Sequence, residues 1–274
     1  MKSDPKPNGG IMGIFNGVAA SYDRIGPRVF AHFGERLVER ASLTQDSRVL
    51  DVATGRGALL FPAAQKIGKH GKVVGIDFSS DMVRETMIDI RRAGCTNVEV
   101  HEMDAEHIQF PDQSFDAVLC GFALWFFPHP DRALREFFRV LKPGGRLSLT
   151  TWAKDSPIQI LYRKALSAYA PPTDPKAPNI DTFGTTDSIE SAFRQAGFQP
   201  LLVDAEDAEF IYTSEDEPWA FVIGTAMKRY IDPLSDAAKS EAKAKLVAGL
   251  ESVRKPDGIH AVYRALFGFA VKAA

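Results

Sequence analysis

One stretch, Val49–Gly57 (VLDVATGRG), constrains the fold of this chain more than any other feature. Its apolar start, interrupted only by Asp51, predicts a short buried strand, and the glycines Gly55 and Gly57 predict a turn into a helix over residues 58–67. Glycine lets the backbone approach a ligand that a Cβ would push away. A strand, a turn and a helix in this order are typical of a nucleotide-type ligand site at the carboxyl edge of a sheet.

Strands and helices then alternate along the chain. Further strands are expected over 73–77, 98–101, 115–120 and 146–152, with helices over 81–93 and 131–141 between them. This alternation predicts a doubly wound α/β fold, in which a mostly parallel sheet has helices on both faces.

The segments on either side of this core suggest a lid and a cap. Two apolar-periodic segments, 11–22 and 27–41, come before the first strand and are candidate lid helices. After the fifth strand the pattern predicts, in order, a helix over 158–170, a helix over 188–196, a strand over 199–205, a run over 208–213, helices over 217–230 and 235–253, and a strand over 259–270. We therefore expect a tail and lid over 1–42 and one domain over 43–274, with cap insertions at about 154–185 and 214–256.

Composition excludes several classes of protein. A formal charge of −2 over 274 residues argues against nucleic acid as the main partner, because phosphate binding needs a basic face. The two cysteines, Cys95 and Cys120, are too few for a disulfide framework or a zinc cluster and indicate a reducing, cytoplasmic setting. We expect no metal site, no signal peptide and no membrane span.

Polar and apolar residues follow the second and third expected strands in an order that suits a nucleoside. Asp77 ends the second strand, where a carboxylate can accept both ribose hydroxyls. Phe78 and Met82 could sandwich an adenine, although core packing explains them as well. Asp104 and Ala105 could bind the adenine edge, or Asp104 could instead cap the turn that follows.

A dinucleotide is the first rival ligand, and with it a nicotinamide-dependent reductase. Its fingerprint needs a third glycine, and Leu60 stands at that position. Asp51, inside the first strand, has no role opposite a pyrophosphate but suits a cation such as an ammonium. A ligand with a ribose, an adenine, an amino acid and no phosphate is S-adenosylmethionine.

Four segments resemble, in order and spacing, the successive motifs of class I S-adenosylmethionine-dependent methyltransferases. They are VLDVATGRG, VVGIDFSSDMV, MDAEHIQFPDQSFDAVLC and REFFRVLKPGGRL. The chain is most similar to the ubiquinone/menaquinone-biosynthesis type (methyltransferase type 11) and its small-molecule relatives, from about Phe15 to Trp152. Phe15-x-x-x-Ala19-x-x-Tyr22-Asp23 is similar to the N-terminal lid motif of that family. The resemblance implies a Rossmann-like, seven-stranded sheet whose last strand, over 259–270, runs antiparallel.

The resemblance also implies where the cofactor binds. By motif match, the expected S-adenosylmethionine-binding residues are Tyr22, Asp51, Ala53, Gly55, Gly57, Asp77, Phe78, Met82, Asp104, Ala105 and Cys120. The glycine turn and Asp51 would hold the methionine part, Asp77 the ribose, and the backbone carbonyl of Cys120 the ammonium. Tyr22 would close over the carboxylate end from the lid.

The stretch after the fourth strand faces the transferable methyl group in this family. It reads Cys120-Gly121-Phe122-Ala123 and lacks the Asn/Asp-Pro-Pro-aromatic motif of enzymes that methylate base amines. Aromatic residues follow, and although part of them belongs to the core, we expect enough to line an apolar acceptor pocket. The expected pocket residues are Phe122, Trp125, Phe126, Phe183 and Trp219.

Methyl transfer is a displacement that depends on alignment and water exclusion, with a base only if the nucleophile carries a proton. Candidate bases are His129, Tyr22, His107 and His101, and none is nominated firmly. The sequence thus predicts methyl transfer to oxygen or carbon of a hydrophobic small molecule. An alternative function is also open, in which the protein uses the bound cofactor for another step such as a cyclisation. The oligomeric state is open too, and a homodimer or higher homo-oligomer is possible.

Overall fold

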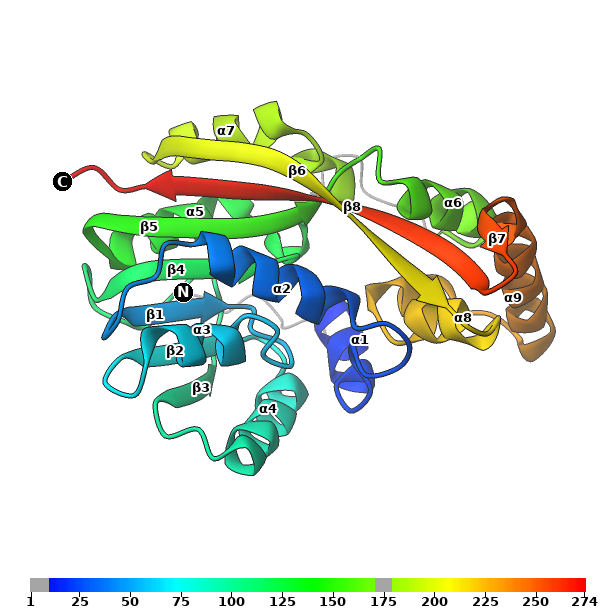
Figure 1. Ribbon diagram of the computed structural model, residues 1–274, viewed down its shortest axis with the longest axis horizontal. Helices are drawn as coiled ribbons and strands as arrows, with labels where there is room; N and C mark the ends of the chain where they lie inside the picture. Colours follow the sequence, from blue (N-terminus) through cyan, green and yellow to red (C-terminus); the bar gives the residue numbers. More distant parts are fainter. Residues whose placement is uncertain (1–9, 171–178) are drawn as a thin grey trace, which may run out of the picture.

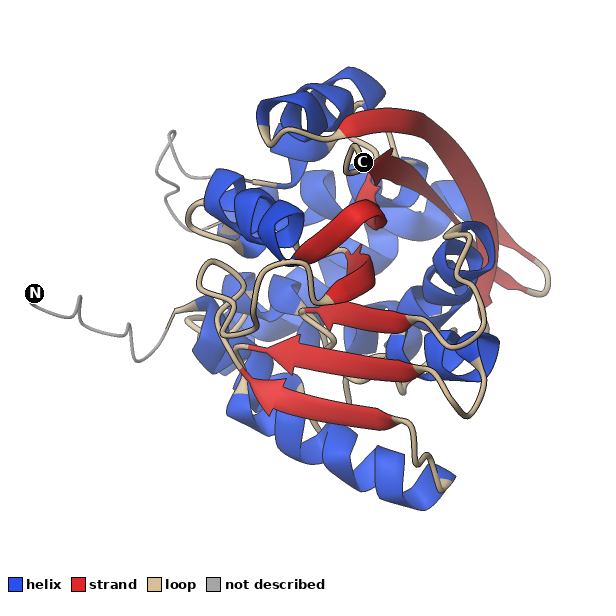
Figure 2. Ribbon diagram, turned by 90° about the vertical axis from the view of Figure 1, so that its left-hand side faces the viewer, coloured by secondary structure: helices blue, strands red, loops and turns tan. Residues whose placement is uncertain are grey.

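The computed structural model describes residues 10–170 and 179–274, which form a twisted sheet with helices on both faces (Figures 1 and 2). The strands are β1 (Arg48–Val52), β2 (Lys72–Asp77), β3 (Val98–Glu102), β4 (Phe115–Gly121), β5 (Leu141–Trp152), β6 (Gln199–Tyr212), β7 (Arg254–Lys255) and β8 (Gly258–Val271). Their order is β3-β2-β1-β4-β5-β8-β6, and the two-residue β7 pairs with β8 beside this path. The seven strands of the path match the predicted fold, and β7 is an eighth strand that the sequence did not predict.

The helices alternate with the strands through the first half of the chain. They are α1 (Ile11–Val18), α2 (Val29–Arg40), α3 (Leu60–Ile67), α4 (Ser80–Ala93), α5 (Pro130–Val140), α6 (Pro157–Leu166), α7 (Thr186–Gln195), α8 (Asp216–Ile223) and α9 (Asp236–Leu250). Short 3-10 helices are η1 (Leu124–Phe126), η2 (Ser167–Tyr169), η3 (Ile180–Phe183), η4 (Ala226–Tyr230) and η5 (Glu251–Val253). The C-cap residue of α4, Gly94, adopts the left-handed conformation that glycine favours (φ 64°).

The parallel part of the sheet positions the site. β1 pairs in parallel with β2 and β4, with Val49 opposite both Val73 and Ala117. β3 and β5 continue the parallel arrangement on the two sides. The carboxyl ends of these strands therefore meet at one edge, and the glycine turn after β1 lies between the ends of β2 and β4.

The last strand runs antiparallel, as predicted. β8 lies between β5 and β6 and is antiparallel to both, with Phe267 opposite Thr150 and Asp204. The predicted strand over 199–205 and the run over 208–213 form one continuous strand, β6. In Figure 1, β6 and β8 extend beyond the other strands toward α6, α8 and α9, so two long strands connect the sheet to the cap.

The cap is built around this extension. Helix α6 contacts both α9 and β8, and α8 contacts α9. Buried tyrosine hydroxyls join the parts: Tyr212 on β6 lies 2.6 Å from Tyr263 on β8, and Tyr162 on α6 lies 3.4 Å from Tyr212. The two predicted insertions thus meet in one structure beside the sheet.

Of the two N-terminal helices, α1 lies at the carboxyl end of the sheet and α2 packs on one face of it (Figure 1). Helix α1 contacts α4 on one side and η4 on the other, and so lies between the sheet domain and the cap (Figure 1). Helix α2 contacts α3 and β5. In the segment between α1 and α2, the carboxylate of Asp23 accepts hydrogen bonds from the backbone N–H groups of Phe30 and Ala31 (3.2 and 2.8 Å). These bonds fix the start of α2.

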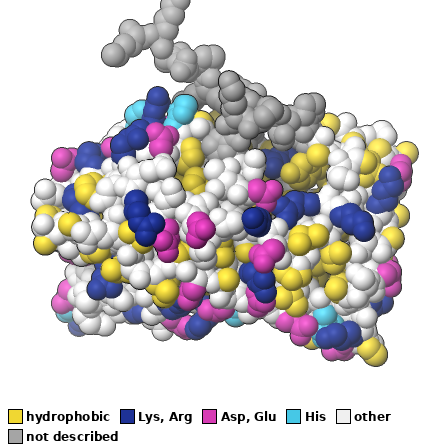
Figure 3. All heavy atoms as spheres, turned by 90° about the horizontal axis from the view of Figure 1, so that it is seen from above, with side chains coloured by type: hydrophobic (Ala, Val, Ile, Leu, Met, Phe, Trp, Pro, Cys, Tyr) yellow, Lys and Arg dark blue, Asp and Glu magenta, His cyan; other side chains and the backbone are white. Residues whose placement is uncertain are grey.

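Within residues 10–170 and 179–274, no helix has the length and apolar character needed to cross a membrane. Both cysteines in this part of the chain are free thiols, and no group of three or more His, Cys, Asp or Glu there is placed to hold a metal ion. On the face drawn in Figure 3, Lys and Arg side chains are interspersed with Asp and Glu.

Candidate active site

A cavity of about 260 Å³ opens at the carboxyl edge, where β1, β2 and β4 end. Most of the predicted cofactor-binding residues line it: Tyr22, Ala53, Gly55, Asp77, Phe78, Met82, Asp104 and Ala105. The other predicted residues, Asp51, Gly57 and Cys120, are buried and do not line it. We call this space the donor cavity.

The turn after β1 has an unusual backbone. Ala53, Gly55 and Gly57 all have positive φ (54°, 50° and 80°). A Cβ on Gly57 would lie 2.6 Å from a ring carbon of Phe61, so the packing of Phe61 requires glycine there. At Gly55, the atom nearest to an added Cβ is a ring carbon of Tyr22 at 3.9 Å, and glycine supplies the left-handed conformation instead.

Asp77 ties this turn to the next helix. Its carboxylate accepts hydrogen bonds from the backbone N–H groups of Gly55 and Ser79, both at 2.8 Å. Ser79 is in turn the N-cap residue of α4. Burial raises the pKa of Asp77 to about 6, because the ionised form loses its water while only backbone N–H groups replace it.

Asp51 lies fully buried beneath the turn. One carboxylate oxygen accepts a hydrogen bond from the hydroxyl of Thr54 at 2.6 Å, and the other has no partner among the described residues. Burial raises the pKa of Asp51 to about 7. Since an unpaired buried carboxylate is costly, a cation bound beside the turn would stabilise it.

The donor cavity fits a phosphate-free, cationic nucleoside. Three acids line it, namely Asp77, Asp104 and Glu106, together with apolar side chains such as Phe78 and Met82. None of the residues that the structure places in this lining is Lys or Arg. A dinucleotide would bring a pyrophosphate to an acidic wall, whereas a ligand with a ribose, an adenine and a positive charge matches it.

The predicted histidine bases do not reach this cavity. His101, His107 and His129 are exposed and absent from its lining. Nδ1 of His107 lies 3.1 Å from the carboxylate of Asp104, and the backbone N–H of His129 donates to Glu106 at 2.7 Å. Both histidines therefore take part in the loops that shape the cavity rather than face it.

Tyr22 lies at a junction of cavities, where its ring stacks on Phe30 with a centroid distance of 5.2 Å. Burial, followed by the nearby Asp23 and Asp77, raises the pKa of its phenol well above the ordinary range. The hydroxyl therefore keeps its proton near neutral pH.

A second cavity, of about 330 Å³, lies between the sheet edge and the cap and is largely aromatic. Its aromatic lining is Phe15, Tyr22, Phe30, Phe122, Trp125, Phe126, Trp152, Tyr162, Phe221 and Tyr230. Four of these residues, Phe15, Tyr22, Phe122 and Phe126, also line the donor cavity, so the two spaces share a wall. We call the second space the aromatic cavity.

The predicted pocket residues divide between this cavity and other places. Phe122, Trp125 and Phe126 line the aromatic cavity. Phe183 does not: it is buried in the core, and its carbonyl accepts a hydrogen bond from the hydroxyl of Thr151. Trp219 lines a separate surface hollow. Tyr162, from α6, and Phe221, from α8, are among the cap aromatics that the sequence offers for such a pocket, and both line the cavity. No local pattern tells which of these aromatics turn inward.

A small third cavity of about 70 Å³ adjoins the glycine turn on the side of α2. Asp23, Arg28 and Thr150 line it, and the hydroxyl of Thr150 is buried without a partner among the described residues. Asp23 and Arg28 come from the segment between α1 and α2 and Thr150 from β5, so no single motif marks them. They could meet the charged end of an amino-acid group that extends past Gly55.

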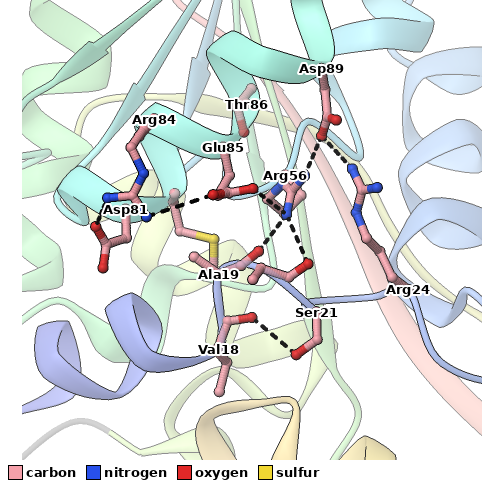
Figure 4. A network of polar contacts seen from close by, with 12 residues as sticks. Val18, Ala19, Ser21, Arg24, Arg56, Asp81, Arg84, Glu85, Thr86 and Asp89 are labelled. Atoms are coloured by element: carbon pink, nitrogen blue, oxygen red, sulfur yellow. Dashed lines mark hydrogen bonds and ion pairs between the residues drawn. The ribbon is translucent and has the colours of Figure 1, made fainter. Parts of the chain in front are cut away.

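Arg56, between the two glycines, connects the turn to the lid (Figure 4). Its guanidinium donates to the backbone carbonyl of Ala19 and pairs with Asp89 of α4 at 2.5 Å. Arg24 of the lid pairs with the same carboxylate. Although burial raises the pKa of Asp89, Arg56 and Arg24 hold it below its ordinary range. We call Arg24, Arg56 and Asp89 the lid latch.

The chain is similar in sequence to known methyltransferases. Residues 43–197 match the family model described as a methyltransferase domain. Aklanonic acid methyltransferase DauC of Streptomyces sp. (strain C5) is 39% identical over 137 residues, which cover 50% of this chain and 62% of that protein. Nocamycin O-methyltransferase of Saccharothrix syringae is 29% identical over 266 residues, 91% and 94% of the two chains. The ubiquinone/menaquinone biosynthesis C-methyltransferase UbiE of Pseudomonas putida (strain W619) is 33% identical over 208 residues, 70% and 78% of the two.

Solved structures share the fold. A protein of Bacillus halodurans C-125 described as a methyltransferase superposes with a TM-score of 0.60 and 26% identity, covering 88% of this chain and 99% of that one. The [4+2]-cyclase SpnF superposes with a TM-score of 0.59 and 23% identity, over 96% and 93% of the two chains. The second likeness concerns the fold alone.

Proposed function

Because the chain belongs to the class I S-adenosylmethionine-dependent methyltransferases, we propose that it transfers a methyl group to oxygen or carbon of an apolar small molecule held in the aromatic cavity. The names of two relatives specify O- and C-methylation, which supports these two acceptor atoms. A methyltransferase of EC class 2.1.1 is the corresponding activity.

One observation carries this proposal: the donor cavity and the aromatic cavity share a wall of Phe15, Tyr22, Phe122 and Phe126. Methyl transfer needs the reacting atoms close and in line. Two adjoining cavities, one acidic and one aromatic, supply that arrangement for a cationic donor and an apolar acceptor.

The donor residues have separate roles in this proposal. Asp77 binds the ribose while it holds the glycine turn, and Phe78 with Met82 encloses the adenine. Asp104 and Ala105 bind the adenine edge. The backbone around Gly121 faces the ammonium, and the carboxylate of Asp51, buried beneath the turn, supplies negative charge behind it.

S-adenosylmethionine supplies a methyl group on a sulfonium, whose leaving group is already good. The chain's own residues therefore align the reactants and exclude water. The lid from α1 and the buried rings of Phe122 and Trp125 exclude water from the shared wall. None of the described residues lining the aromatic cavity is a histidine or a carboxylate, so these residues supply no general base there.

Incubation of the protein with methyl-labelled S-adenosylmethionine and a metabolite extract tests the proposal. A labelled small molecule identified by mass spectrometry is the expected result. Trp125→Ala, which alters the aromatic cavity alone, should lower product formation and leave donor affinity unchanged, whereas Met82→Ala, in the donor cavity alone, should weaken donor binding.

Tight donor binding without any labelled product would contradict methyl transfer. It would favour the alternative in which the bound cofactor supports another step such as a cyclisation. The homo-oligomeric state, the cytoplasmic setting and the division at residue 42 stay predictions.

A further inference from the structure

The aromatic cavity is lined by two cationic side chains, but none of its described lining residues is placed to act as a general base. Its described lining contains no Asp, Glu, His, Lys or Cys, and its ionisable side chains are tyrosines and the arginines Arg163 and Arg229. Burial raises the pKa of Tyr162 to about 12, and that of Tyr22 is raised further by the same cause. These two tyrosines keep their protons near neutral pH, so they do not accept one from an acceptor.

The two arginines differ in how their charge is compensated. Arg163 donates to the carboxylate of Asp181 and to the backbone carbonyl of Lys154, both at 2.6 Å. Arg229 donates one hydrogen bond, to the hydroxyl of Tyr230 at 2.9 Å, and its guanidinium lies over the Tyr230 ring, 5.0 Å from the centroid. No ion pair joins it to a carboxylate among the described residues. Its Nε is buried without a partner. A buried donor of this kind points to a missing acceptor.

A neutral polar side chain lines the same cavity. Gln159 is only 6% exposed and makes no side-chain hydrogen bond to a described residue. It shares one face of α6 with Tyr162, Arg163 and Leu166, which are spaced at helical intervals and line the cavity too. The cavity therefore presents a guanidinium without a carboxylate partner and an amide without a hydrogen bond, both among the described residues, to a ligand that is otherwise held by rings.

We propose that the acceptor binds as an oxygen anion on a planar apolar molecule, a carboxylate or an acidic phenol, and that Arg229 is the residue that selects it. This inference rests on the proposed function. The guanidinium holds the acceptor in its ionised state, and Gln159 binds a second oxygen. Arg229 is a specificity-determining residue, not a base.

The chemistry then balances without a proton acceptor. The oxygen anion forms a bond to the methyl carbon with its own electron pair, and the bond from that carbon to sulfur breaks with its pair left on sulfur. No proton has to leave. The anion and the sulfonium are both neutralised, so the methylated product loses its attraction to Arg229 and dissociates.

Binding of two matched probes tests this assignment. 2-Naphthoate and methyl 2-naphthoate differ only in the charge and the added methyl group, and they mimic acceptor and product. With the protein saturated with S-adenosylhomocysteine, calorimetry should show naphthoate binding about tenfold to a hundredfold more tightly than the ester, the range expected for a charge-assisted hydrogen bond. In Arg229→Gln this ratio should fall to near one, and Arg229→Lys should retain much of it.

Arg163→Gln is the matched control, because it removes a cation from the same wall that is already paired. It should reduce the ratio far less than Arg229→Gln does. Equal binding of the two probes to the wild-type protein, or an unchanged ratio in Arg229→Gln, would overturn the assignment.

4-Nitrophenol distinguishes an acidic phenol from a carboxylate as the preferred anion. Its phenolate absorbs visible light, so the ionisation of the bound phenol can be followed by absorbance. Lowering of the apparent pKa of the bound phenol in the wild-type protein, and its return toward the free value in Arg229→Gln, indicates an acidic phenol. Binding of naphthoate without such a change indicates a carboxylate. Affinity for S-adenosylhomocysteine, measured in every variant, shows whether the donor site is intact. Failure of the proposed function would look different: no labelled product would form, although the protein would still prefer the anionic probe.

Discussion

At the scale of single residues, Asp77 combines ligand binding with support of the backbone. Its carboxylate holds Gly55 and Ser79 and also lines the donor cavity. We expect Asp77→Ala to weaken binding of S-adenosylmethionine by roughly 1–3 kcal/mol, the cost of losing charged hydrogen bonds. Isothermal titration calorimetry measures this directly.

The chain offers a matched control for this change. Glu102 ends β3 directly opposite Asp77, but it is exposed and does not line the donor cavity. Glu102→Ala should bind the donor like the wild type. Unchanged affinity in Asp77→Ala would remove Asp77 from the ribose site.

Asp51 predicts how donor binding depends on pH. Its pKa in the free protein is raised to about 7, and that of Asp77 to about 6, both by burial. A bound cation favours the ionised carboxylates, so binding releases protons. Affinity should therefore rise from pH about 5 to about 7 and be lost as these carboxylates are protonated.

Calorimetry in buffers of different ionisation enthalpy counts the released protons. Asp51→Asn should flatten the upper part of this rise, because Asp51 has the higher pKa of the two. A pH-independent affinity in the wild-type protein would contradict the role given to Asp51.

The sequence located residues that follow strands better than residues on cap helices. Asp77 and Asp104 could be placed because the carboxyl ends of parallel strands meet at one edge. Phe183 and Trp219 could not, because the orientation of the cap is set by tertiary packing. Arg229 belongs to no motif in the sequence. Its proposed role in selecting an anionic acceptor depends on the fold, which places no carboxylate of the described residues beside it.

At the scale of elements, the lid latch couples α1 and the turn after it to α4. Asp89 pairs with Arg24 of the lid and with Arg56 of the glycine turn. We expect Asp89→Asn to weaken both ion pairs and to increase opening of the segment over 19–24. Hydrogen exchange should become faster there, and donor affinity should fall.

Asp81→Asn is the matched control for the latch. Asp81 lies on the same helix and, within the part of the chain that the structure describes, forms its one ion pair with Arg84 at the surface. Its removal should leave exchange in the lid as it is in the wild type. Equal exchange in both variants would show that the latch does not hold the lid.

Element boundaries show where local pattern stops being informative. The buried strands β1, β2 and β4 agree with prediction within about a residue or two, because near-continuous apolar runs mark them. The edge strand β6 was predicted as two pieces, since Asp204–Glu209 interrupts its apolar pattern. Arginines from distant elements pair with these acids, as Arg40 does with Asp204 and Arg264 with Asp207. Such partners are visible only in the fold.

At the scale of the whole molecule, sheet and cap are joined by two strands that run through both. The hydroxyl pair of Tyr212 and Tyr263 lies in the cap part of β6 and β8. We expect Tyr212→Phe to cost about 1–2 kcal/mol of unfolding free energy, because it leaves the buried hydroxyl of Tyr263 without its closest partner.

Denaturant unfolding followed by near- and far-ultraviolet circular dichroism checks this expectation. The two signals should shift together to a lower midpoint, since the cap cannot loosen without the strands that it shares with the sheet. Separate midpoints would mean that the cap unfolds on its own.

The position of β8 has a consequence for how the molecule is made. β8 follows every other strand in the chain, yet it is inserted between β5 and β6 and gives β6 its pairing along its whole length. During synthesis on the ribosome, β1 to β5 can pair as they emerge, but β6 has no neighbour until residues 258–271 leave the exit tunnel. The cap and one wall of the aromatic cavity must therefore wait for these residues, so acceptor binding should be the last property that the nascent enzyme acquires.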